Sequence, residues 1–360
     1  MPREETNAST PRVSVDSLDT NHRQVFSRAL QNVLSSDAAE LTYAQIVDGL
    51  PLSAIERDTI RGSVDCDHPI HTKHTELCPG VIETLREILN THDIGSLKFD
   101  STLVDAYNNA SPGSRAFETR LIEMIAVAVH QIAIQLFKSE TSLHESDGMG
   151  SWQPAEDSVF WDIHKTMFPT LFRHPQYCDY DLYPDGLADG VAYWAENRIL
   201  GGVVLFDRRA PDSPPNNNNE IEVDPNAIYF HSSGRMITYR IYQLIDKQRC
   251  DLVKFLLSET TTPAECPIPM HGTSENQQRI DPEEAVTDTG VYRDVWERKP
   301  LALGQADPRD RTVWDKIEHP TLREFCNTRR RAGLRKMRAA AIYREEERKK
   351  RHKIHKPHKL

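Results

Sequence analysis

The chain has 360 residues, with 44 Lys and Arg against 54 Asp and Glu, which gives a formal net charge of −10. Hydrophobic residues make up 38% of it, and its 16 Gly and 22 Pro are too few for a wholly disordered chain. The longest uncharged apolar run, residues 124–137, is shorter than the roughly 20 residues that a membrane-spanning helix needs. We therefore expect a protein that contacts no membrane.

The N-terminal segment, residues 1–20, is polar and rich in Ser, Thr and Pro, which predicts disorder. No apolar stretch follows a basic start, so the sequence predicts no secretory signal and a location in the nucleus or cytoplasm. Thiols stay reduced in those compartments. We therefore expect the six cysteines to form no disulfide framework.

The clearest helix in the sequence covers residues 114–138. Ser114 is a favourable N-cap residue, and residues 116–137 contain neither Gly nor Pro. From Met124 onward the side chains are apolar nearly all round. Because a helix that is apolar on every side is buried on every side, we expect this helix at the centre of the core.

The middle of the chain changes character. Residues 189–198 predict a short helix, and residues 199–206, 227–231 and 236–244 predict strands separated by turn-forming residues. These strands form a small antiparallel meander over residues 199–244. Helices beside such a meander define the α+β class.

The predicted organisation is one mainly helical α+β domain over residues 21–325, between a disordered N-terminus and a basic helical tail over residues 326–360. The Pro-rich stretch at residues 259–320 is irregular and is expected to wrap around this domain. No internal repeat interrupts this order.

A group of metal-ligating residue types lies within 13 residues: Cys66, His68, His71, His74 and Cys78. Zinc takes four nitrogen or sulfur ligands, and short loops supply them as close pairs. The group is therefore a candidate zinc site, although the chain has no Cys-x-x-Cys pair. The alternative is a solvated loop in which His is simply a polar residue, and no cofactor at all.

Residues 161–196 combine histidines, carboxylates and aromatic side chains, as the lining of a catalytic pocket would. The catalytic candidates are His164, His174, Asp179, Asp181 and Glu196, and the pocket-wall candidates are Trp161, Tyr193 and Trp194. The alternative is that the aromatic residues fill the core and the acids face solvent. His130 lies on the apolar helix, where a lone His is more often a hydrogen-bonded core residue than a catalyst.

The charge is divided unevenly along the chain. Residues 329–360 hold 14 of the basic and 3 of the acidic residues, a net of +11, and the 30 basic and 51 acidic residues that remain leave residues 1–328 at −21. The tail carries two basic clusters in a bipartite nuclear-import layout: Arg335 and Lys336, then Arg348, Lys349, Lys350, Arg351 and Lys353. The expected partners are an import receptor and an acidic protein or nucleic acid. The alternative is a tail that lies on its own acidic body.

Two stretches resemble uncharacterised proteins of filamentous ascomycete fungi. They are residues 190–209, which contain Trp194 and the pair Gly201-Gly202, and residues 289–298, which contain Trp296. The likeness extends over about residues 100–325. It implies a fungal intracellular protein and brings no activity, cofactor or site residue with it.

These observations favour a non-catalytic, intracellular and nuclear interaction protein that contacts an acidic partner through its basic tail. The competing class is an enzyme that acts on a small molecule in a pocket built from residues 161–196. The two differ in whether the histidines and carboxylates of that region converge on one concave site.

Overall fold

The computed structural model describes residues 11–58, 64–139, 141–144, 147–158, 160–163, 167–210, 223–234, 238, 240–260, 265–280, 282, 286–298 and 323. The predicted basic tail at residues 326–360, with all of its import-signal residues, lies outside this part of the chain. His164 also lies outside it.

Helices and antiparallel strands both occur, which confirms the α+β class. The helices are α1 (Thr20–Leu34), α2 (Asp37–Asp48), α3 (Ser53–Asp58), α4 (Ile70–Lys73), α5 (Val81–Thr91), α6 (Ser101–Asn108), α7 (Arg115–Lys138), α8 (Phe160–Ile163), α9 (Leu187–Leu200), α10 (Asp246–Leu257) and α11 (Val286–Thr289). The strands are β1 (Arg12–Ser14), β2 (Lys98–Asp100), β3 (Val203–Asp207), β4 (Ile228–His231), β5 (Ile241–Gln243), β6 (Arg279–Ile280) and β7 (Val291–Tyr292).

The larger sheet has the strand order β6-β5-β4-β3-β7, with every neighbouring pair antiparallel. Its centre, β3-β4-β5, is the predicted meander, which is confirmed. Strands β6 and β7 extend it on both edges and were not predicted, because two residues are too few to show a period of two.

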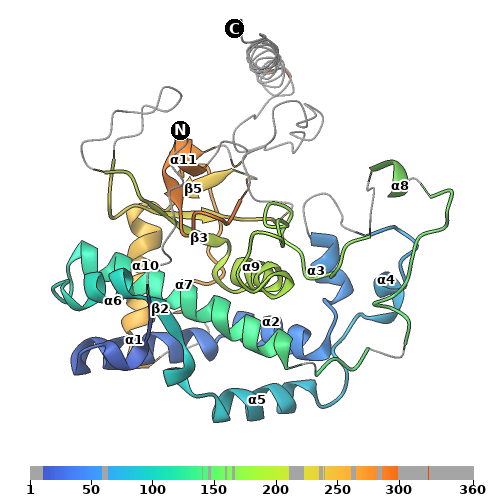
Figure 1. Ribbon diagram of the computed structural model, residues 1–360, viewed down its shortest axis with the longest axis horizontal. Coiled ribbons are helices and arrows are strands. Elements are labelled where there is room, and N and C mark those ends of the chain that lie inside the picture. The colour runs from blue at the N-terminus through green and yellow to red at the C-terminus, as the bar shows by residue number, and fades with distance from the viewer. Residues whose placement is uncertain are drawn as a thin grey trace, which may run out of the picture.

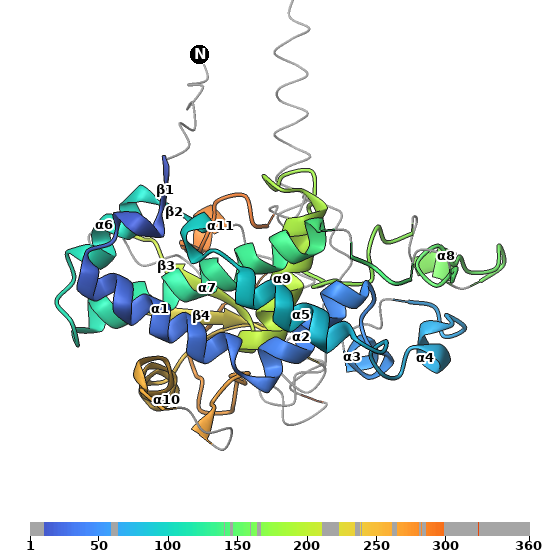
Figure 2. The ribbon, with the colours of Figure 1, turned by 90° about the horizontal axis from the view of Figure 1, so that it is seen from below.

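The elements stack in layers (Figure 1). The sheet lies over α7 and α9, which pack against each other, and α1 and α2 cover α7 on the side away from the sheet, with α5 packed on α2. Figure 2 shows this helical face toward the viewer. Successive residues of β3 point to opposite faces: Val204 and Phe206 join the main core, while Val203 and Leu205 join a second core with Tyr193.

The central helix α7 is confirmed, and Ser114 caps it by accepting a hydrogen bond from the backbone N–H of Phe117 at 3.1 Å. The expectation that it is buried on every side is wrong. Val127 and Gln131 are only half-buried and Gln135 is exposed, whereas every residue of α9 from 188 to 197 is buried. The side chain of Gln131 pairs with the backbone of Lys98, so this stripe of α7 faces β2 and solvent.

By length and composition, α7 is also the one helix among the described residues that could cross a membrane. In its most apolar window of 18 residues, 72% of the residues are buried inside the protein. The core helix of a folded domain has these same properties, so they carry no further conclusion.

Two predicted boundaries need correction. Residues 11–20 are structured, contrary to the disorder predicted for them, because β1 pairs with β2, Val13 opposite Phe99, and Val15 is fully buried. Backbone pairing and this apolar contact order a segment whose composition alone indicated disorder. The strand predicted at residues 199–206 also starts late, because α9 continues to Leu200 and ends at Gly201, which has a left-handed φ of 101°.

Candidate functional site

A cavity of about 910 Å³ opens along the polar stripe of α7. One face of that helix forms its floor, through Arg120, Glu123, Val127, His130, Gln131 and Ile134. Residues of β2 and α6 line one side, and parts of residues 184–193, 208 and 293–296 line the rest. A cavity of this size is large enough for a small organic molecule.

Four buried ionisable groups meet at one end of the cavity. Nε2 of His130 lies 3.0 Å from Oδ1 of Asp189, and its Nδ1 lies 3.4 Å from Oε2 of Glu196. Nη1 of Arg293 donates to both oxygens of Glu196, at 2.8 and 2.7 Å. His130, Asp189 and Arg293 line the cavity, and Glu196 lies behind them.

The charges of this group balance when His130 is protonated. Burial alone would lower the pKa of His130, but hydrogen bonds to Asp189 and Glu196 outweigh it and raise that pKa. Burial would raise the pKa of Glu196, and the adjacent Arg293 lowers it instead. Two carboxylates, one guanidinium and one imidazolium then carry no net charge. Mutual attraction in such a neutral group offsets part of the desolvation free energy of its buried charges.

The other end of the floor carries two guanidinium groups. Arg120 donates to Oε2 of Glu123 at 2.6 Å, and Arg208 donates to its other oxygen, so two guanidiniums share one carboxylate. Both guanidiniums also lie against the ring of Phe206, 5.6 and 5.2 Å from its centroid. Asp294 supplies a further negative charge near Arg208, and the two guanidiniums can still offer N–H donors to an anionic group in the cavity.

The predicted catalytic residues that the structure describes do not converge on one site. His174 is fully buried; its Nε2 lies 3.2 Å from the backbone oxygen of His231, and its Nδ1 accepts a hydrogen bond from the backbone N–H of Gln176. Asp179 is half-buried and Asp181 is exposed. Of the four candidates that the structure describes, Glu196 alone joins the charged group described above.

The predicted pocket walls also separate. Tyr193 lines the cavity, where its ring packs edge-on against His130 with the centroids 4.6 Å apart. Trp194 points into the main core against Phe172, and Trp161 on α8 donates its Nε1–H to the backbone oxygen of Ala155. These two indoles serve packing in the described part of the chain.

Several residues of the charged group were not selected from the sequence. Arg293 carries no local motif, His130 was set aside as a core histidine, and Asp189 belongs to the carboxylates of residues 161–196 but was not among the catalytic candidates. The available signal for His130 was a polar residue in an apolar segment of a helix. Its partners Asp189 and Arg293 lie 59 and 163 residues away along the chain, so no local pattern connects them with it.

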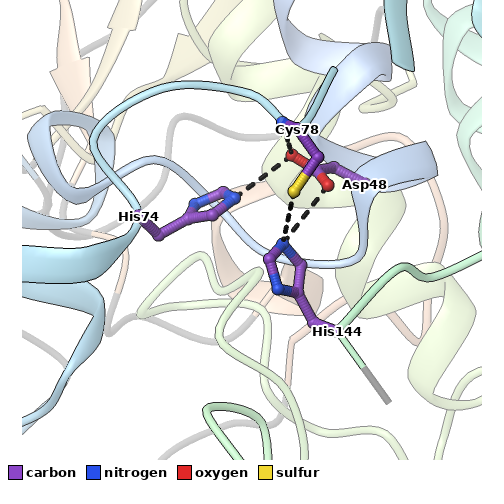
Figure 3. A group of neighbouring side chains, drawn as sticks. All are labelled: Asp48, His74, Cys78 and His144. Atoms are coloured by element: carbon purple, nitrogen blue, oxygen red, sulfur yellow. Dashed lines mark hydrogen bonds and ion pairs between the residues drawn. The ribbon is translucent and has the colours of Figure 1, made fainter. Parts of the chain in front are cut away.

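A second group of polar side chains lies at the C-terminal end of α2 (Figure 3). Asp48, His74, Cys78 and His144 each offer one ligand atom, and these atoms all lie within 4.8 Å of one another. Two of the five predicted zinc ligands, His74 and Cys78, are therefore brought together, with two partners that the sequence pattern did not include.

The other three predicted ligands are used differently. Cys66 is exposed. His68 accepts a hydrogen bond from the backbone N–H of Ile70 through Nδ1, and Nε2 of His71 lies 3.1 Å from the backbone oxygen of Asp65.

No protein-family model matches this chain, and neither a curated protein nor a solved structure matches it. A functional interpretation therefore depends on the chemistry of these two groups and of the sequence itself. The resemblance to uncharacterised fungal proteins stays a prediction.

Proposed function

We propose that the protein binds a small anionic molecule in the cavity along α7 and acts on it through the His130–Asp189 pair by proton transfer. The observation that carries this proposal is the 3.0 Å contact between His130 and Asp189 in the lining of a cavity whose floor also holds Arg120 and Arg208. An acid–base pair and an anion-binding pair on one concave surface are the two elements that such chemistry needs.

The spacing along α7 sets the size of the ligand. Glu123 and His130 are seven residues apart, which corresponds to about 10 Å along a helix axis. A molecule with a carboxylate or phosphate at the Arg120 and Arg208 end would therefore place a group about 10 Å away against His130. This is the length of a small metabolite and not of a polymer.

The His130–Asp189 pair has the properties of a proton donor. Hydrogen bonds to Asp189 and Glu196 outweigh burial and raise the pKa of His130, which favours the protonated ring, and Nε2 can donate to Asp189 at 3.0 Å. Asp189 also accepts a hydrogen bond from the backbone N–H of Asp185 at 2.6 Å, which fixes its orientation. A proton passed from this pair to a bound ligand would return from solvent through the cavity opening.

The test is a thermal-shift screen of the full-length protein against small carboxylates, dicarboxylates and phosphate monoesters. We expect a subset to raise the melting temperature of the wild type and to leave that of Arg208→Ala unchanged. Arg86→Ala is the matched control, because Arg86 pairs with Glu40 on the surface and does not line the cavity. A panel without any stabilising member, or an Arg208→Ala variant that responds like the wild type, would overturn the proposal.

A second candidate function is supported by the charge distribution. A tail of net +11 that follows a body of net −21 suits a nuclear protein that binds an import receptor and an acidic protein or nucleic acid. The two functions are compatible, because the tail and the cavity involve different residues.

A further inference from the structure

We propose that Asp48, His74, Cys78 and His144 bind one zinc ion, which joins the end of α2 to the loop before α5 and to the segment after α7. The four residues come from three separate stretches of the chain, and Figure 3 shows their side chains pointing toward a common centre. This site is independent of the function proposed for the cavity.

The separations between the ligand atoms fit a tetrahedral zinc site. Zinc bonds of about 2.0 Å to nitrogen or oxygen and about 2.3 Å to sulfur place the ligand atoms of a tetrahedron about 3.3–3.7 Å apart. Nε2 of His74 lies 3.1 Å from Oδ2 of Asp48 and Nε2 of His144 lies 3.2 Å from its Oδ1, and one ligand atom from each of the four residues lies within 4.8 Å of the others. Sγ of Cys78 lies 3.6 Å from Nε2 of His144.

Hydrogen bonds on the outer side of each imidazole fix its tautomer. Nδ1 of His74 lies 3.1 Å from the backbone oxygen of Pro51, which can only accept, so Nδ1 carries the hydrogen. Nδ1 of His144 lies 2.5 Å from Oδ2 of Asp147, and the same reasoning holds for it. The Nε2 atoms of both neutral rings then present lone pairs to the centre, the arrangement found in histidines that ligate a metal.

A cation resolves an otherwise unfavourable contact. Two imidazole lone pairs aimed at a buried carboxylate repel it, and Oδ1 of Asp48 is fully buried without a hydrogen bond from the described residues. The alternative without a metal is an extra proton on one or both rings, and two imidazolium ions would lie with centroids 4.7 Å apart in a buried site. One divalent ion serves all four groups at once.

The ligand types favour zinc over other common ions. Two imidazoles and one thiol suit zinc, whereas magnesium and calcium prefer oxygen ligands throughout. Cys78 would bind as the thiolate, and its proton would pass to solvent. Because four protein ligands fill a tetrahedron and three of them are buried, the site is structural and not catalytic.

The surrounding backbone supports this role. The backbone N–H of Cys78 donates to Oδ2 of Asp48 at 3.0 Å, and the backbone N–H of Leu143 donates to the backbone oxygen of Asp48 at 3.0 Å. Gly49, in the left-handed region at φ 103°, leaves no room for a side chain, because a Cβ there would meet Oγ of Ser142 at 2.0 Å. The three stretches are thus already held close together around the ligand atoms.

The experiment is a metal analysis of the full-length protein purified without a metal-affinity tag, followed by replacement of its metal with cobalt. We expect one zinc per chain, and with cobalt the strong visible bands of a tetrahedral site together with a thiolate charge-transfer band in the near ultraviolet. Cys78→Ser should lose that charge-transfer band. Cys66→Ser, whose exposed thiol lies in the same region of sequence, should retain both the band and the zinc.

Two results would overturn the proposal: protein that neither contains zinc nor responds to cobalt, and a charge-transfer band lost in Cys66→Ser but kept in Cys78→Ser. If Cys78→Ser fails to fold, the wild type provides the test. Its melting temperature should drop after treatment with a chelator and recover on addition of zinc. An unchanged melting curve would contradict the structural role.

Discussion

Arg293 donates two hydrogen bonds from one nitrogen, Nη1, to both carboxylate oxygens of Glu196, 97 residues away in the sequence. The carboxylate of Glu196 is fully buried, and its Oε1 also accepts the backbone N–H of Val204 at 2.6 Å. This one contact joins α9, β3 and the segment after β7. It also holds Arg293 beside His130 at the end of the cavity.

Glu196→Ala should destabilise the protein strongly, because it removes the fully buried carboxylate that pairs with Arg293 and leaves Asp294, 3.3 Å from Nε, as the other carboxylate paired with that guanidinium. Breaking one partner of a buried ion pair costs about 3–5 kcal/mol. The matched control is Glu40→Ala, which removes the exposed pair with Arg86 and should cost less than about 1 kcal/mol. Urea unfolding measures the free energy of unfolding of both variants. Equal losses would contradict the assignment of Glu196 and Arg293 to a buried ion pair.

His174 should make the protein sensitive to acid. Burial lowers the pKa of His174 to about 3, below its unfolded value of about 6.5. The unfolded state therefore takes up a proton first, and stability that is present above about pH 6.5 is lost as the pH falls toward the folded pKa, by about 1.4 kcal/mol per pH unit.

His174→Gln removes this titration while its amide can still donate to the backbone oxygen of His231. Unfolding free energies of the wild type and the variant, measured between about pH 7 and pH 4, should converge as the pH falls. Two parallel curves would show that His174 is not buried in its neutral form.

The basic tail at residues 326–360 should act through its charge. Deletion of residues 348–360 removes seven basic groups and no predicted core residue, so the melting temperature should stay the same. Nuclear accumulation of a fluorescent fusion should be lost, and any binding to polyanions should weaken and become less dependent on salt. Unchanged localisation together with a lower melting temperature would mean that the tail stabilises the acidic body instead.

The parts of the fold that depend on local signals could be predicted from the sequence. Ser114 and the long segment without Gly or Pro specify α7, and strands separated by turn-forming residues specify β3 to β5. Strand β7 has two residues and exists through its pairing with β3, which no local pattern encodes. The exposed stripe of α7 was missed for the same reason: the side chain of Gln131 accepts a hydrogen bond from the backbone of Lys98, and this tertiary contact has no local sequence signal.

In the candidate sites, too, local sequence patterns indicated some residues, whereas others are brought in by tertiary packing. Two residues of the proposed zinc site, His74 and Cys78, lie close together in the sequence, in a segment rich in Cys and His that suggested a metal site. Asp48 and His144 lie 26 and 66 residues away from the ligands they contact, and His144 falls in a polar loop without a motif. Tertiary packing alone brings such residues together, so residue types and spacing indicated a metal site but only part of its ligand set.

The central claim is that the cavity along α7 binds a small anion, and calorimetric titration tests it most directly. The panel compound that stabilises the wild type most would be titrated into the wild type, Arg208→Ala, Arg208→Lys and Arg86→Ala. A hydrogen bond to a charged group contributes about 1.5–3 kcal/mol, so Arg208→Ala should bind roughly 10-fold to 100-fold more weakly. Arg208→Lys should recover part of the affinity, and Arg86→Ala should match the wild type. Equal affinities for the wild type and Arg208→Ala would contradict the claim.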